Sequence, residues 1–438
     1  MKSLRIYAAV GVVMELCYLS FYAVPAGPGE VLLLIGVNAV TYGLLAFAVW
    51  RMRREPGITP PGRRLLPLLI GFGLLFRLTL VPHGVVGSDD VYRYLWDGKT
   101  AASGINPYRY LPTDPEVADL ASEELPAKVN HPELRSVYPP LAQLFFLLSH
   151  LLFGDSVAGV KMLLVVLDGL TLLLLWRLLR ERGGSALPLM LYAWSPLPVL
   201  YFGLDGHIDA LGILFLVLSL CFFLTRRPVR GGVALGLSVL AKLVPLILVP
   251  LLLHAERGMR RLVVLAMPLL VVLLGYLFYY EPTWGVFDSL RTFGSRWEFN
   301  GGVFSIVYFL SGSNETAHLF STIEIALWIG VIAFLRRPLL EKVFWGFAGF
   351  ILLSPVVHPW YLTWLAALLA LRWSPSIFAF LGLSCLANVV VYQYRAFGEW
   401  NDQPLLLLLE YLPVFLLLAR EFMRGEVLRQ SPGMQNGG

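Results

Sequence analysis

Apolar segments about as long as a membrane is thick recur along this chain, and they limit its fold more than any other feature. Windows at 31–50, 208–224 and 262–280 each carry at most one charged residue. About 20 apolar residues in a helix span a hydrocarbon core of roughly 30 Å. Of the 438 residues, 57% are hydrophobic and 14% are charged, whereas about a quarter of a soluble domain is charged. The chain is therefore predicted to be an all-α polytopic membrane protein.

The N-terminal segment, the cysteines and the net charge are all consistent with a membrane protein. The apolar segment near the N-terminus has a basic start but a poor cleavage site at 23–27, so we expect a retained helix. Cys17, Cys221 and Cys385 lie in apolar segments without metal-type spacing and read as small core residues. The net charge of +5 comes from short loops between helices, which excludes a nucleic-acid signal.

Basic clusters set the predicted topology, because short cytoplasmic loops are rich in lysine and arginine. An even number of crossings must separate consecutive clusters if all of them are cytoplasmic. Segments 1–50 then form a transmembrane hairpin, and helix 65–81 leads to an outer loop, 82–156. Segment 139–153 is short and begins with two prolines, so we expect it to lie on the outer surface without crossing. The clusters lie at 51–64, 177–182, 226–230, 257–261, 336–342 and 420–429.

Lys242 interrupts two short apolar halves, 231–241 and 244–254, which predicts a broken helix pair with the lysine near its apex. A second outer loop is expected at 281–303. The whole would be a bundle of about 13 or 14 transmembrane helices, with a catalytic domain at 65–421 and a cytoplasmic tail at 422–438. The remaining expected helices are 157–179, 185–203, 208–225, 262–280, 317–335, 343–357, 359–372, 376–394 and 404–421.

A polar stretch, 88–99, opens the outer loop and contains the adjacent carboxylates Asp89 and Asp90. Like charges held together at a membrane surface are costly, which favours a chemical or cation-binding role. The alternative is that one of them caps a helix at 91–102. If 90–102 is helical, Asp90, Tyr94 and Asp97 share one face.

Other polar residues fall on the same predicted side. A loop carboxylate could deprotonate an acceptor hydroxyl, and Lys242 with Arg296 or Arg93 could neutralise a lipid phosphate. His207 could instead be a helix-start residue, and Asp209 a helix N-cap. No Walker-type loop or dinucleotide fingerprint is present. The candidate substrate-binding residues are Tyr92, Tyr94, Asp97, His207, Asp209, His358 and Tyr361.

Several short motifs, taken in order, resemble the GT-C superfamily of membrane glycosyltransferases, and bacterial members similar to glycosyltransferase family 87 most of all. The resemblance covers about 65–395. It rests on the acidic pair and on the motifs Gly104-x-Asn106-Pro107-Tyr108, Tyr138-Pro139-Pro140-Leu141, Gly206-His207-x-Asp209-Ala210-Leu211, Lys242 in its broken pair, and Ser354-Pro355-Val356-Val357-His358-Pro359-Trp360-Tyr361.

This resemblance implies a GT-C-like fold and an enzyme that moves a hexose, typically mannose, from a polyprenyl-phosphate carrier to a glycan or glycolipid. Transfer would invert the anomeric centre, with Asp90 or Asp89 as the base. The site would face the outer side of the cytoplasmic membrane. Two helices precede helix 65–81 where many members have none, so 1–50 is read as an added hairpin. No cofactor is assigned, and a requirement for a divalent cation stays open.

Two other classes compete with this interpretation. A secondary transporter or flippase of a lipid-linked or small anionic substrate would also have many helices, a broken helix and a buried lysine. A non-enzymatic, lipid-binding scaffold is the third. The hydropathy shows no inverted repeat, and the acids lie in a loop rather than at the midplane, so the transferase is favoured.

Overall fold

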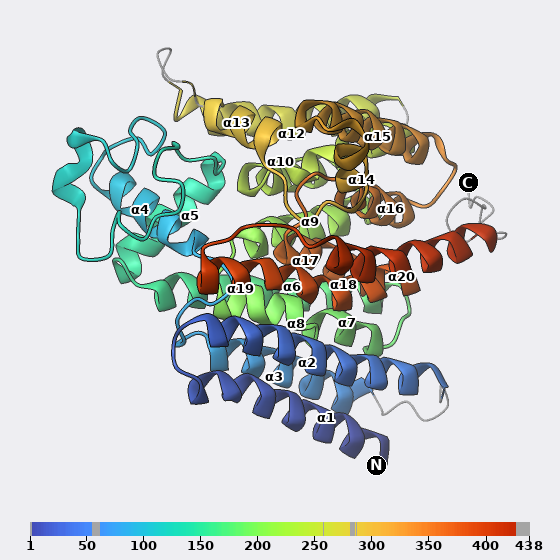
Figure 1. Ribbon diagram of the computed structural model, residues 1–438. Helices are drawn as coiled ribbons and strands as arrows, with labels where there is room; N and C mark the ends of the chain where they lie inside the picture. Colours follow the sequence, from blue (N-terminus) through green and yellow to red (C-terminus); the bar gives the residue numbers. More distant parts are fainter. Residues whose placement is uncertain (1, 55–61, 257, 281–284, 286, 426–438) are drawn as a thin grey trace.

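A computed structural model describes residues 2–54, 62–256, 258–280, 285 and 287–425. They form a bundle of helices (Figure 1), and the extended pairing within them is limited to isolated bridges from Phe299 and Asn300 to Val356. Among the described residues, seven helices are long and apolar enough to cross a membrane, and shorter apolar helices accompany them. The all-α polytopic class is thereby confirmed. Parts of the predicted loop 281–303 and tail 422–438 lie outside the described residues.

Helices α1 (Lys2–Leu19), α2 (Pro28–Arg54) and α3 (Gly62–Leu80) lie together along one edge of the bundle (Figure 1). Arg77 of α3 is fully buried and pairs with Asp168 of α6 (Val157–Glu181). The Tyr192 hydroxyl also donates to Asp168, and the Arg77 guanidinium donates to the carbonyl of Ala193. A buried ion pair with these additional bonds is satisfied in the membrane. The network fixes α3 against the core.

Helices α4 (Asp90–Ala102) and α5 (Pro140–Phe153) pack together at one end of the bundle (Figure 1). The start of α6 lies beside the end of α3. Lys161 Nζ, near the start of α6, donates to the carbonyl of His83, just after α3, at 2.7 Å. The segment that contains α5 therefore begins and ends at the same end of the bundle. That α5 does not cross the membrane stays a prediction.

Each face of α5 has a separate role. Phe146 stacks on Tyr94 of α4 with ring centroids 4.5 Å apart. Leu144, Leu148 and Leu151 are exposed on the opposite face. An apolar face exposed at this position suits contact with lipid.

The broken helix pair predicted around Lys242 is present. Helix α10 (Pro228–Ala241) ends at Lys242, whose backbone is extended, and a 3-10 turn, Val244–Ile247, leads into α11 (Leu248–Ala255). The neighbouring elements are α7 (Met190–Ala193), α8 (Pro196–Pro198), a π-helical turn (Val199–Leu204), α9 (Asp209–Leu224) and α12 (Met259–Leu277).

The C-terminal third contains two helices that hydropathy did not predict, α13 (Asp288–Arg296) and α14 (Gly302–Ser311). Both are shorter than a membrane span, so an apolar window of membrane-spanning length does not detect them. The others are α15 (Asn314–Phe334), α16 (Leu339–Leu352), α17 (Leu362–Leu369), α18 (Pro375–Leu383), α19 (Asn388–Phe397) and α20 (Pro404–Met423).

Arginines collect at the end of the bundle away from α4 and α5. Helix α2 has Glu30 in its first turn, 3.6 Å from His83, and ends in arginines. Helix α6 begins near His83 and has Arg180 in its last turn. Arg337 reaches the carbonyl of Gly425, just after α20. Helix α1 begins and α20 ends on this side (Figure 1).

Candidate functional site

Asp90 is the first residue of α4, and Asp89 precedes it without a side-chain capping bond. Asp89 thus occupies the N-cap position, but its carboxylate makes no capping hydrogen bond there. The Asn130 amide instead donates to both carboxylates, at 2.7 Å from Asp90 Oδ1 and 3.1 Å from Asp89 Oδ1. Asp89 is exposed, whereas the Asp90 side chain is 22% exposed. Asp90 is the carboxylate that faces the interior.

Burial and the neighbouring Asp89 charge together raise the pKa of Asp90 to about 6. The Asn130 amide and the Lys242 charge act in the opposite direction. A carboxylate with a pKa near the working pH is ionised yet basic enough to accept a proton. The environment of Asp90 thus suits a general base.

His207 lies directly beside Asp90. Its Nδ1 is 3.6 Å from Asp90 Oδ2, its side chain is 1% exposed, and neither ring nitrogen has a hydrogen-bond partner among the described residues. Burial, with the charge of Lys242, holds the pKa of His207 well below its usual range. The turn that delivers it needs Gly206, whose φ of +73° places it in the left-handed region. A neutral imidazole with unpaired nitrogens is thus aimed at the carboxylate.

A stack of four rings connects the two halves of the chain at this point. Trp360 lies on His207 with centroids 4.1 Å apart, His358 lies on Trp360 at 4.1 Å, and Phe299 covers His358 at 4.4 Å. Burial, with the charge of Lys242, lowers the pKa of His358 to about 3. Both histidines are therefore neutral, and their ring edges are polar without carrying charge.

Lys242 is held at the same place by an ion pair. Its Nζ lies 2.7 and 2.8 Å from the two carboxylate oxygens of Asp209, at the start of α9, and 4.3 Å from the centre of the Tyr361 ring. Trp364 Nε1 donates to Asp209 at 2.6 Å. Asp209 has a side chain committed to these partners, so the N-cap interpretation is wrong. The Lys242 side chain is 19% exposed and remains accessible.

Two predicted residues have structural partners instead. The Arg93 guanidinium donates to the carbonyls of Asn130, His131 and Leu134, and so shapes the turn that presents Asn130. Asp97 is buried and accepts from Ser136 and Gln143. Asp97 therefore lies at the α4–α5 contact with partners of its own, and its substrate-binding role stays a prediction.

Arg296, Tyr92 and Tyr94 complete the predicted set. Arg296 is exposed on α13, while Lys242 has Asp209 and Tyr361 as partners, so the phosphate role of Arg296 stays a prediction. Tyr92 faces Lys128 at 5.2 Å. Tyr94 is buried between Phe146 and Tyr138.

Three members of the site, Asn130, Trp360 and Trp364, are not among the site residues predicted from the sequence. Asn130 falls in an Asn-His-Pro turn, and Trp360 follows His358 in the segment 354–361. Trp364 comes one helical turn later. A polar or aromatic residue beside a proline in a turn was the signal in the sequence. Such a pattern does not predict which distant residue it will contact.

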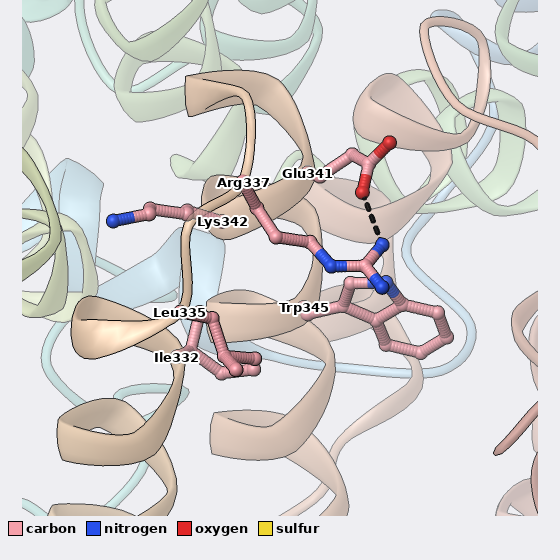
Figure 2. Close-up of a pocket in the computed structure, with 6 residues that line it drawn as sticks. All are labelled: Ile332, Leu335, Arg337, Glu341, Lys342 and Trp345. Carbon is pink, nitrogen blue, oxygen red and sulfur yellow. Dashed lines mark hydrogen bonds and ion pairs between the residues drawn. The ribbon is translucent and has the colours of Figure 1, made fainter. Parts of the chain in front are cut away.

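Two surface hollows lie away from this cluster. The one in Figure 2 is formed by α15, α16 and their link, and has no room for a water molecule. Its Arg337 is already paired with Glu341. The other, about 290 Å³, lies in the outer loop beside Glu124 and Asp155. Within the described residues no group of three or more His, Cys, Asp and Glu side chains converges to hold a metal ion.

Residues 9–256 match a family model described as alpha-(1->6)-mannopyranosyltransferase, N-terminal domain. The match covers more than half of the chain and includes Asp89, Asp90, His207, Asp209 and Lys242. His358 and Trp360 lie beyond it. A comparison with curated protein sequences gives no significant match.

Proposed function

Since the chain belongs to the alpha-(1->6)-mannopyranosyltransferase family, we propose that it moves mannose from a polyprenyl-phosphate carrier to a glycan or glycolipid acceptor in the membrane. The observation that carries the proposal is that a carboxylate suited to act as a base and a lysine suited to bind phosphate lie at the same end of the bundle. Asp90, with its pKa of about 6, lies beside His207, and Lys242 lies on the ring of Tyr361. Transfer from a lipid phosphate needs both groups.

In the proposed reaction, the Asp90 carboxylate takes the proton of the acceptor hydroxyl. The acceptor oxygen then bonds to C1 of mannose from the face opposite the phosphate, and the C1–O bond to the phosphate breaks with its electron pair. The polyprenyl phosphate leaves as a monoester with one more negative charge. Lys242 stabilises that charge, and the configuration at C1 inverts.

The distribution of arginines supports an extracytoplasmic site in the cytoplasmic membrane. Helices that begin near the site, such as α6, end in basic residues, and short basic loops face the cytoplasm. Carrier-linked sugar is a suitable donor on that side because nucleotide sugars are cytoplasmic. Transport is less favoured, since Asp90 begins α4 and His207 lies in the turn before α9, rather than midway along a helix.

Deletion of the gene, followed by mass analysis of envelope glycans and lipid-linked intermediates, tests this proposal. We expect a glycan short of one or more mannoses and accumulation of the acceptor. Restoration by the wild-type chain but not by Asp90→Asn would tie the loss to the site. An unchanged glycan profile would contradict the proposal.

A further inference from the structure

The ring stack that contains His207 connects with α20 through Asn300, a residue outside the segment matched by the family model. Its φ of +51° is left-handed, a conformation that asparagine tolerates better than most residues. Its backbone N–H donates to Asp402 at 2.8 Å, and its carbonyl accepts from the Tyr411 hydroxyl at 2.7 Å. Its side-chain amide donates to Glu410 at 3.2 Å. Asn300 is thus held from three sides.

Phe299 transmits this anchoring to the site. Its N–H donates to the carbonyl of Pro355 at 3.0 Å, and its carbonyl accepts from the N–H of Val357 at 2.8 Å. The next residue, His358, lies under the Phe299 ring and on Trp360. Trp360 in turn covers His207, 3.6 Å from Asp90. A continuous set of contacts runs from α20 to the carboxylate.

Glu410 has no evident reason to be buried except this contact. Glu410 lies on α20 and is 1% exposed, and the Asn300 amide donates a hydrogen bond to its carboxyl group. A buried carboxyl group costs free energy unless its bonds are made. A leucine at this place would pack without that cost, so the carboxyl group marks a position where the bond to Asn300 matters.

We propose that Glu410 and Asn300 form a positioning latch, by which α20 sets the orientation of the His358–Trp360–His207 ring stack against Asp90. This inference rests on the proposed function, because the latch would act on the rate of the mannosyl-transfer step. It does not touch the donor phosphate, which Lys242 is proposed to bind. Loss of the latch should therefore lower kcat and leave the KM for the donor nearly unchanged.

A second buried glutamate on the same helix provides a matched control. Glu421 is 3% exposed and accepts bonds from Ser374 and from the N–H of Ser376, at the start of α18. It lies three turns from Glu410, near the other end of α20. Removing either carboxyl group disturbs a buried bond, but only Glu410 connects with the ring stack.

The test compares Glu410→Leu, Glu410→Gln and Glu421→Leu in the purified full-length chain in lipid nanodiscs. One readout is transfer from short-chain polyprenyl-phosphate mannose to a mannoside acceptor, scaled to folded protein. The other is hydrogen exchange of 299–301 and 355–361, which needs no substrate. We expect Glu410→Leu to lower kcat about 10²-fold, with donor KM within about twofold, and to lose protection in both segments. Glu410→Gln, which keeps the acceptor oxygen, should restore both readouts, and Glu421→Leu should change neither.

Equal effects of Glu410→Leu and Glu421→Leu on both readouts would overturn the latch, as would unchanged exchange in Glu410→Leu. If the wild-type chain transfers no mannose, the proposed function fails. The latch is then decided by hydrogen exchange alone.

Discussion

At the scale of single residues, Asp90 is held in two conflicting environments. Burial and the Asp89 charge favour its protonated form, while Asn130 and Lys242 favour the carboxylate. With a pKa of about 6, the Asp90 carboxylate is ionised at neutral pH, and it becomes protonated as the pH falls through that value. We therefore expect kcat/KM to fall below about pH 6, whereas an ordinary aspartate would lose its charge only near about pH 4. A pH–rate profile measures this.

Variants at the pair separate the two carboxylates. Asp90→Asn should reduce turnover by about 10² or more in a folded protein. Asp89→Asn should keep turnover and move the acidic limb to lower pH, because it removes a charge that raises the pKa of Asp90. Near-normal rates for both variants would show that neither residue is the base.

Lys242 is expected to act on the donor alone. Lys242→Met removes the ammonium group that lies on Tyr361 and should raise the KM for polyprenyl-phosphate mannose more than the KM for the acceptor, since only the donor carries phosphate. Lys128→Met is the control, because Lys128 is an exposed lysine of the outer loop. Equal losses for donor and acceptor would contradict the phosphate role.

At the scale of elements, the contact between α4 and α5 depends on Gly98. A Cβ at this position would lie 2.4 Å from the carbonyl oxygen of Phe146. Gly98→Ala should therefore force α4 away from α5 and lower stability by about 1–3 kcal/mol. Gly71→Ala in α3 is the control, since a Cβ there meets nothing within 4 Å. Thermal unfolding in detergent compares them, and an equal Tm for Gly98→Ala and wild type would contradict the close contact.

The position of α5 at the outer surface has its own test. In a chain whose cysteines are replaced, Asp155→Cys should react with an impermeant thiol reagent added outside the cell. Arg182→Cys, at the other end of α6, should react only after the cytoplasm is opened. Labelling of position 155 only from the cytoplasm would mean that α5 crosses and that the site is divided between two sides.

The sequence predicts much of the element order because apolar length and arginine placement act locally along the chain. The helix from Asp90 to Ala102 and the break at Lys242 both follow from local patterns. The helices α13 and α14 do not, because they are too short to give a membrane signal. Polar helix ends likewise indicate a site without indicating which groups meet.

At the scale of the whole molecule, partners far apart in sequence decide the site. Asn130 joins the two carboxylates across the outer loop, and Trp360 joins His207 from the opposite half of the chain. Asp209 and Asp97 have clear partners in the fold, Lys242 and Gln143, that no local pattern names. Such pairings depend on tertiary packing, so the sequence identifies candidates and the structure sorts them.

Mannose transfer by the purified chain in sealed vesicles tests the proposed function most directly. Labelled mannose would be supplied either as polyprenyl-phosphate mannose or as GDP-mannose, with wild type and Asp90→Asn compared at pH 7.5. We predict product from the lipid-linked donor alone, with inverted configuration at C1, and about 10²-fold less product from the variant. Transfer from GDP-mannose, or equal product from wild type and Asp90→Asn, would contradict a lipid-linked mannosyltransferase with Asp90 as its base.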